Sequence, residues 1–231
     1  MDWSTLIDLD KQLLLLLNGS DSLYIDTLVK TLTTATTWIP LYAALIYLLF
    51  KNNDSLQKVL LIIACAVVCV LLAGSLDDMV VKPLVGRWRP THDQEIGLLV
   101  DTVNNYRGGR FGFFSAHASN TFSLAIFLTL VVRSRVLSVT LVGWSLLNCW
   151  TRLYLGVHFP GDILVGLLWG ATVAISVWYV YHRICTSVQP DAGAYISTQY
   201  TATGYQRTDV DAVVCVFFYT LLYALIRACF F

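Results

Sequence analysis

Three clusters of polar residues interrupt the apolar segments of this chain, and each contains side chains that phosphate chemistry needs. They are Lys82 to Pro90, Ser115 to His117, and Arg152 to Asp162. Arginine binds phosphate oxygens through a planar fork of donors, lysine binds them as a point charge, and histidine can serve as a nucleophile or a general acid. If the apolar segments pack side by side, the clusters predict a site that binds a phosphate and displaces it.

The candidate phosphate-binding cations are Lys82, Arg89 and Arg152. A lysine or arginine at the end of a membrane helix can instead extend to the membrane surface and anchor that helix. That alternative explains Lys51 and Arg183 well. It explains Arg152 poorly, because Arg152 interrupts an apolar segment.

The second cluster, Ser115-Ala116-His117, stands directly before a long apolar segment that we expect to be a helix. Serine is a favoured N-cap residue, and the free N–H groups of a first helical turn bind anions. The cap and the phosphate site would then be one place. Taken alone, this segment is explained equally well by a serine that only caps the helix.

The third cluster places His158 and Asp162 four residues apart, with Pro160 and Gly161 between them. Proline favours the first turn of a helix, so we expect His158 just before a helix and Asp162 in its first turn. There the carboxylate would accept the Nδ1–H of His158 and leave Nε2 as a nucleophile. Either residue alone is typical of a membrane interface, whereas the three clusters together favour a catalytic site.

The composition is typical of a membrane protein. Of the 231 residues, 57% are hydrophobic and 13% are charged. We therefore expect one all-α domain over residues 1–231, a polytopic bundle of membrane helices. The formal net charge of zero argues against a nucleic-acid partner. The six cysteines form no CxxC pair, so we interpret them as packing residues and not as a zinc site or disulfide framework.

The apolar segments predict about six membrane-spanning helices. Residues 4–17 are apolar but shorter than the roughly 20 residues that a span needs, which predicts an interfacial N-terminal helix. The expected spans are residues 24–50, 59–76, 118–132, 136–150, 163–181 and 212–226. Residues 77–112 would form a polar connection. Residues 24–182 would form the core, followed by a polar linker at 183–210 and an extra C-terminal span at 211–231.

Alternation of the spans sorts the basic residues to two sides of the membrane. Lys51, Lys58, Arg133, Arg135 and Arg183 fall on one side, which the positive-inside rule makes cytoplasmic. The three clusters and the N-terminal helix then lie on the opposite, outer face of the membrane. Five cations on that face count against this orientation unless they bind ligands: Lys82, Arg87, Arg89, Arg107 and Arg110.

The order Lys-x6-Arg-Pro, Ser-x-His and Arg-x5-His-x3-Asp resembles the type 2 phosphatidic acid phosphatase family, over residues 82–162 and the surrounding helices. The resemblance implies that His158 is a nucleophile forming a phosphohistidine, that Asp162 orients it, and that His117 is the general acid. It implies no metal and no other cofactor. The implied phosphate-binding groups are Lys82, Arg89, Ser115, the backbone N–H of Ala116, and Arg152.

This chain has Phe114 and Ala116 where the family commonly has proline and glycine. The loop with Arg107 and Arg110 resembles that of Bacteroidetes-type bacterial members. This resemblance implies a multi-pass protein of the bacterial inner membrane with its site facing the periplasm. These arginines either bind a second phosphate or sugar-phosphate headgroup, or are surface charges. His92 is expected to support the loop.

Asp77 and Asp78 precede Lys82 by five and four residues. We expect them to form an ion pair with it at the outer end of a helix.

The expected function is hydrolysis of a lipid phosphate, with undecaprenyl pyrophosphate or a lipid A phosphate as substrate. Phosphatidylglycerophosphate is an alternative substrate, and a lipid phosphotransferase is an alternative enzyme. A lipid-binding membrane protein without activity is the non-enzymatic alternative. The motifs indicate a phosphate and a membrane, and they do not indicate which lipid or which oligomeric state.

Overall fold

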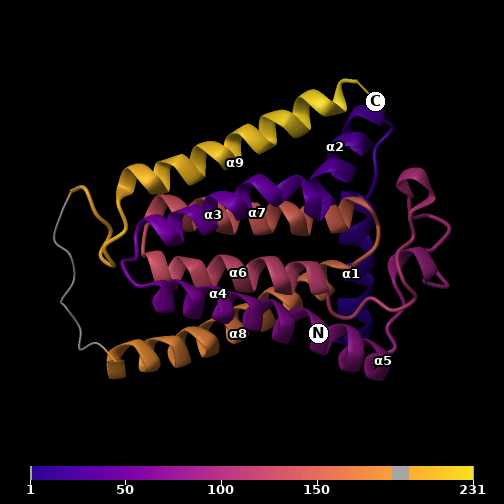
Figure 1. The fold of residues 1–231 in the computed structure, drawn as a ribbon. Helices are drawn as coiled ribbons and strands as arrows, with labels where there is room; N and C mark the ends of the chain where they lie inside the picture. Colours follow the sequence, from indigo (N-terminus) through magenta and orange to yellow (C-terminus); the bar gives the residue numbers. More distant parts are fainter. Residues whose placement is uncertain (1, 189–197, 231) are drawn as a thin grey trace.

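The computed structural model describes residues 2–188 and 198–230. Most of these residues are helical, and their only β pairings are two isolated bridges, Trp88 with Phe111 and Tyr200 with Gln206. The all-α class is therefore confirmed (Figure 1). The α-helices are α1 (Trp3–Leu17), α2 (Leu23–Thr33), α3 (Ile39–Lys51), α4 (Leu56–Val70), α5 (Lys82–Val85), α6 (Ala116–Val132), α7 (Arg135–Tyr154), α8 (Pro160–Val188) and α9 (Arg207–Ala228).

Length and hydropathy identify fewer membrane spans than the sequence predicts. Among the described residues, three stretches are long and apolar enough to cross a membrane: Leu56–Val85, Pro160–Cys185 and Arg207–Ala228. A fourth is the bent pair Leu23–Thr33 and Ala35–Lys51. The apolar helix α6 is shorter than these.

The second span is longer than predicted. It continues from α4 through two π-helical turns, η2 (Leu71–Ser75) and η3 (Asp77–Val81), into α5. The helix can contain the buried Asp77 because Lys82, 2.8 Å away, neutralises its charge. It ends at Gly86, whose φ of +64° is a left-handed cap conformation that glycine adopts without strain. Lys82 therefore belongs to a helix and not to the predicted polar connection.

The predicted polar linker at 183–210 is also shorter in the structure. Helix α8 extends to Val188, and α9 begins at Arg207. Residues 189–197 of that linker lie outside the described residues.

The first span is broken, where the sequence suggested one helix from residue 24 to residue 50. Helices α2 and α3 meet at 68°, joined by the 3-10 turn η1 (Ala35–Trp38). Side chains bind the carbonyls that the break exposes: Thr37 Oγ1 donates to Thr31 O at 2.7 Å, and Trp38 Nε1 donates to Leu32 O at 2.8 Å. These bonds compensate the lost helical ones in a setting without water.

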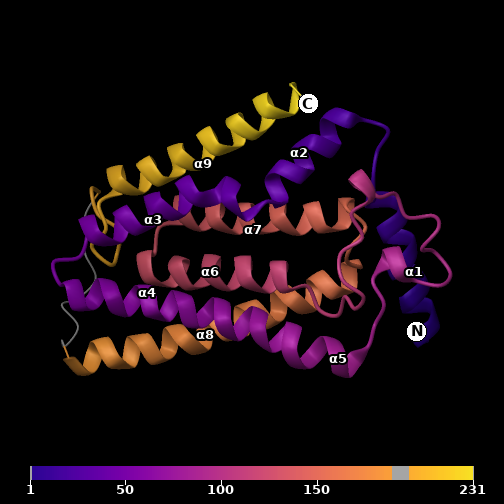
Figure 2. The ribbon, with the colours of Figure 1, turned by 45° about the vertical axis from the view of Figure 1, so that its right-hand side comes forward.

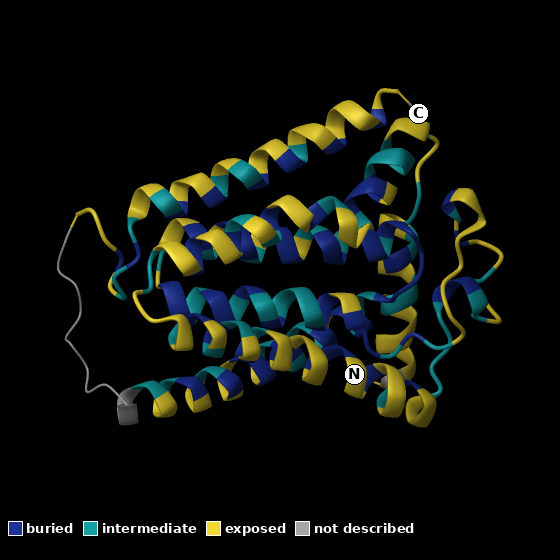
Figure 3. Cartoon of the chain, viewed as in Figure 1, coloured by how far each residue is buried: buried dark blue, intermediate teal, exposed yellow. Residues whose placement is uncertain are grey.

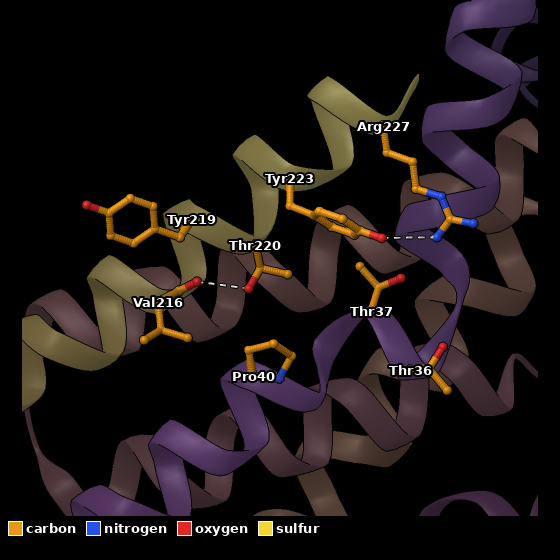
Figure 4. A pocket seen from close by; sticks show the side chains of 8 residues that line it. All are labelled: Thr36, Thr37, Pro40, Val216, Tyr219, Thr220, Tyr223 and Arg227. Carbon is orange, nitrogen blue, oxygen red and sulfur yellow. Dashed lines mark hydrogen bonds between the residues drawn. The ribbon is translucent and has the colours of Figure 1, made fainter. Parts of the chain in front are cut away.

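Trp38 fixes the break against its neighbours. Its ring is 1% exposed, stacks on Phe217 of α9 at 5.9 Å between centroids, and meets Trp144 of α7 edge-on. A hollow of about 400 Å³ opens beside the break, between α9 and the start of α3 (Figure 4). Its walls include Thr37, Pro40 and Tyr223, and it contains no residue of the three clusters.

Helix α6 lies at the centre of the bundle, beside α4, α7 and α8, while α9 covers α2, α3 and α7 (Figure 1). The outward faces of the helices are exposed and largely apolar, as a bilayer requires (Figure 3). Helix α8 approaches α6 closely because Gly166 and Gly170 face it. A Cβ at these glycines would lie 2.8 Å from Ser115 O and 2.5 Å from Ser119 O.

Helix α1 runs across the ends of the other helices, at the end where the loop between α5 and α6 lies (Figures 1 and 2). The α3–α4 and α6–α7 turns lie at the opposite end. Several leucines of α1 are exposed, including Leu16 at 81%. The arrangement places the three polar clusters and α1 at one end of the bundle.

Candidate active site

The structure brings the three clusters together where α6, α7 and α8 meet. Lys82 is on α5, Ser115 caps α6, and Arg152 lies in the last turn of α7. His158 occupies the short connection between α7 and α8 and is 1% exposed. Each functional side chain therefore sits at a helix end or in a loop joined to one.

His158 is held as one tautomer by two hydrogen-bond partners. Arg89 Nη1 lies 3.2 Å from Nε2, and the carbonyl oxygen of Gly112 lies 2.9 Å from Nδ1. Arginine can only donate and a carbonyl can only accept. The proton is therefore on Nδ1, where it is donated to Gly112, and Nε2 carries the lone pair that a nucleophile needs.

The expected hydrogen bond between Asp162 and His158 is absent. Asp162 Oδ2 lies 3.7 Å from His158 Nδ1, beyond hydrogen-bonding distance. Oδ2 instead accepts from the backbone N–H of Phe159 at 3.0 Å, and Oδ1 accepts from Arg87 Nη1 at 2.7 Å. The carboxylate closes the first turn of α8, and its charge lies beside the imidazole without a direct bond to it.

Burial lowers the pKa of His158 well below its ordinary value, and the positive charges of Arg89, Arg152 and Lys82 lower it further. The imidazole is therefore neutral at physiological pH. A neutral imidazole with a free Nε2 lone pair is the reactive form of a histidine nucleophile.

Arg89 and Arg152 are cations without anions. Among the described residues, no carboxylate forms an ion pair with either. Arg152 is 3% exposed, and its guanidinium bonds only hydroxyl groups: Nη1 donates to Thr33 at 2.9 Å and Nη2 to Tyr106 at 3.4 Å. Its buried Nε has no partner in the described part of the chain. Burial, followed by the charge of Arg152, lowers the pKa of Arg89. A buried cation is costly when no anion compensates it, so the site favours an anionic ligand.

Lys82 is paired, as predicted. It lies 2.8 Å from Asp77 and forms a second ion pair with Asp78. Asp77 Oδ1 also accepts from the backbone N–H of Phe114 at 3.0 Å. Asp77 thus joins the start of α5 to the segment that leads into α6.

Ser115 is buried and caps α6, with its Oγ accepting from the N–H of Ala118 at 3.4 Å. Its own N–H donates to the carbonyl of Asp162 at 3.1 Å, which joins the starts of α6 and α8. Ala116 follows in the first turn with helical geometry, so its methyl group causes no backbone strain. His117 lies in the same turn of α6 and is exposed.

The arginines of the long loop lie outside this cluster. The guanidinium of Arg110 stacks over Trp88 at 4.6 Å, and Arg107 Nη1 donates to the carbonyl of Thr91 at 3.4 Å. His92 lies 3.1 Å from the Thr91 hydroxyl, as a loop-supporting residue would. Both arginines are exposed, and headgroup binding by them stays a prediction.

The sequence interpretation missed three contributors to the site. Arg87, grouped there with the ligand-binding cations, bonds two carboxylates and is already neutralised. The carbonyl of Gly112 fixes the His158 tautomer. The sequence could not identify this acceptor, because every residue has a main-chain carbonyl. Tyr106 covers Arg152, with its ring 5.9 Å from the guanidinium.

Comparison with known proteins agrees with this geometry. The family model of the PAP2 superfamily matches residues 58–185, which hold all three clusters. The chain belongs to the PAP2 superfamily. It is 39% identical over 187 residues to the lipid A 4'-phosphatase of Bacteroides thetaiotaomicron, covering 80% of this chain and 83% of that protein. It is 31% identical to the lipid A 4'-phosphatase of Porphyromonas gingivalis, covering 76% and 74%.

A decaprenylphosphoryl-5-phosphoribose phosphatase of Mycobacterium tuberculosis is 37% identical over 99 residues, 43% of this chain and 50% of that protein. No solved structure matches the chain significantly. As a member of the PAP2 superfamily with these relatives, the protein is a phosphatase that hydrolyses phosphate esters.

Proposed function

We propose that this PAP2 protein is an inner-membrane phosphatase that removes the 4'-phosphate of lipid A at the periplasmic face through a phosphohistidine. The observation that carries the proposal is the pair of uncompensated guanidinium groups, Arg89 and Arg152, beside a neutral His158. A phosphate monoester supplies the missing negative charge. It also gives the Nε2 lone pair an electrophile.

In the first step, Nε2 of His158 attacks phosphorus and the bond from phosphorus to the lipid oxygen breaks. Arg89 Nη1 turns from Nε2 to a phosphate oxygen, and Arg152 donates through its Nε. His117 gives a proton to the leaving lipid oxygen. The charge that develops on the phosphoryl oxygens is stabilised by the cations and by the free N–H groups at the start of α6.

In the second step, water attacks the phosphorus of the phosphohistidine. His117 takes a proton from the water, the bond from phosphorus to Nε2 breaks, and inorganic phosphate leaves. His158 returns to its starting tautomer because Nδ1–H remains bonded to Gly112 throughout.

The choice of lipid A rests on the relatives. The two lipid A 4'-phosphatases match about three quarters or more of both chains. A lipid A 1-phosphatase of Rhizobium etli matches less, with 29% identity over 115 residues. Undecaprenyl pyrophosphate and phosphatidylglycerophosphate remain alternative substrates.

The membrane placement rests on charge and shape. Lys51, Arg133 and Arg135 lie at the turns opposite the site (Figure 1), and the positive-inside rule makes that end cytoplasmic. We propose six spans, counting α2 with α3 as one, α4 to α5 as one, and α6, α7, α8 and α9. Helix α1 would lie in the outer interface with its leucines in lipid.

The test is phosphate release by the detergent-purified protein from lipid A, undecaprenyl pyrophosphate and phosphatidylglycerophosphate, with EDTA present. His158→Ala should abolish release. His182→Ala is the matched control, because His182 lies on α8 twenty residues beyond Asp162, at the cytoplasmic end. Release from lipid A that survives EDTA and is lost only in His158→Ala supports the proposal.

Water labelled with ¹⁸O separates hydrolysis from transfer, since hydrolysis places one labelled oxygen in the released phosphate. Unlabelled phosphate, or phosphate found on another acceptor, would indicate a phosphotransferase. Equal release from His158→Ala would refute the histidine mechanism. Preference for undecaprenyl pyrophosphate would refute the assignment of lipid A.

A further inference from the structure

Arg87 bridges two carboxylates that lie far apart in the sequence. Its Nη1 donates to Asp162 Oδ1 at 2.7 Å, and its Nη2 donates to Asp10 Oδ2 at 2.6 Å. Asp10 belongs to α1, and its other oxygen accepts from the backbone N–H of Gly161 at 2.7 Å. The side chains are 27%, 14% and 0% exposed for Arg87, Asp10 and Asp162, so water screens these contacts weakly.

These contacts surround the segment that carries His158. The guanidinium of Arg87 also lies over the ring of Phe159, 4.3 Å from its centroid. The N–H of Phe159 bonds Asp162, and the N–H of Gly161 bonds Asp10. Side chains from α1 and from the loop after α5 thus hold the turn from His158 to Asp162.

Arg87 and Arg89 are two residues apart and face different partners. Arg89 lies within hydrogen-bonding distance of His158 Nε2 and forms no ion pair among the described residues. Arg87 forms ion pairs with Asp10 and Asp162. Because both carboxylates neutralise it, Arg87 has little charge left for a phosphate. Its guanidinium contacts the segment from His158 to Asp162 through Phe159 and Asp162.

Asp10 is also the contact by which α1 reaches this turn. Elsewhere α1 is held at the rim of the site by Lys11, which pairs with Asp93 and Glu95, and by Leu14 in a small core. No other side chain of α1 among the described residues bonds the turn.

We propose that Asp10 and Arg87 are positioning residues that aim His158 Nε2 by fixing the turn through Asp162 and Gly161. The inference rests on the proposed role of His158 as nucleophile. Removing the Asp10 charge frees Arg87 and loosens the turn, so the nucleophile loses its alignment while Arg89 and Arg152 keep the phosphate. Misplacement of a reacting group by about 1 Å can cost about 100-fold in rate.

The experiment compares Asp10→Asn with Asp8→Asn. Asp8 is exposed on the same helix and forms no ion pair within the described part of the chain, so it controls for loss of an acidic residue from α1. With lipid A in mixed micelles, Asp10→Asn is expected to lower kcat at least about tenfold with KM changed less than about twofold, and Asp8→Asn to change neither. The double variant Asp10→Asn/Arg87→Gln is expected to have the same kcat as Arg87→Gln alone, because the charge of Asp10 acts on the turn through Arg87.

A second readout needs no turnover. Orthovanadate can form a fifth, axial bond to Nε2 and therefore reports the aim of the nucleophile, whereas inorganic phosphate reports only the cations. Both affinities are measured by the rise in unfolding temperature with added anion. Asp10→Asn is expected to weaken vanadate binding at least about tenfold and to leave phosphate binding unchanged.

The outcomes separate the inference from the function on which it rests. Wild-type affinity for both anions with equal vanadate affinity in Asp10→Asn overturns the inference alone. A rise in KM with unchanged kcat overturns it too, because Asp10 and Arg87 would then bind the lipid directly. A wild-type protein that binds neither anion and releases no phosphate refutes the proposed function, and the inference falls with it.

Discussion

Replacing the two glycines at which α8 meets α6 is expected to change stability and activity in different proportions. A Cβ at Gly170 would lie 2.5 Å from Ser119 O, and one at Gly166 would lie 2.8 Å from Ser115 O, against 3.4 Å for ordinary contact. Both obstacles are backbone atoms, so the helices must separate by several tenths of an ångström and by almost 1 Å at Gly170. Such overpacking typically costs about 1–3 kcal/mol.

Gly143 on α7 provides the control, because a Cβ there meets nothing within 4 Å. Gly143→Ala is expected to be neutral or to stabilise by about 0.5–1 kcal/mol through helix propensity. Since about 1 kcal/mol shifts the unfolding temperature of a chain of this size by about 2–4 °C, Gly170→Ala should unfold several degrees below Gly143→Ala. Gly166→Ala should lose less stability because its contact is longer.

Activity should rank the variants in the opposite order. Gly166 faces Ser115, whose N–H bonds Asp162 and whose helix start lies in the site. Gly166→Ala is therefore expected to reduce kcat more than Gly170→Ala does. The assay is thermal unfolding by tryptophan fluorescence together with phosphate release. Unfolding temperatures for both variants equal to that of Gly143→Ala would refute this account of the helix contact.

Two further predictions concern His158 and Arg152. The native state keeps His158 neutral, whereas the unfolded chain protonates it below about pH 6.5 and so binds more protons. His158 is therefore expected to lower the free energy of unfolding by up to about 1.4 kcal/mol per pH unit below that pH. His158→Gln should remove this contribution from the measured slope between pH 5 and 7, and an unchanged slope would contradict the prediction. Inorganic phosphate at a hundredfold excess over its Kd should raise the free energy of unfolding of the wild type by about 2.7 kcal/mol. We expect Arg152→Gln to lose this stabilisation and the control Arg135→Gln to keep it. Equal stabilisation of all three proteins would contradict the anion site.

The convergence of the clusters was predictable because each one ends or begins an apolar segment. Ser115 occupies the expected helix start, and Asp162 lies in the predicted first turn of α8. Arg152 lies in the last turn of α7, which extends past the predicted span of residues 136–150. The partner of His158 was not predictable, because the acceptor is a main-chain carbonyl that any residue carries. Without that carbonyl in view, the nearby Asp162 was the only acceptor that a sequence offers.

Two features of the fold had signals in the sequence. The expected single span over residues 24–50 contains threonines at 34 and 37, and their hydroxyls donate to the carbonyls at the break: Thr34 donates to Lys30 O and Thr37 donates to Thr31 O. Gly166 and Gly170 have the four-residue spacing of close helix contacts in membranes, which identifies the α6-facing side of α8. The roles of Arg87 and Arg89 had no such signal, since only the fold determines which arginine finds carboxylates.

The packing of α9 against α2 and α3 has a consequence for the order in which the protein assembles during its synthesis. Trp38 stands at the break between α2 and α3, and the ring that stacks on it, Phe217, belongs to α9, which is synthesised later. Thr33, which bonds Arg152, stands at the same break. A nascent chain can thus carry all three clusters before α9 has been made, so we expect the break beside Arg152 to settle only after α9 has packed against Trp38.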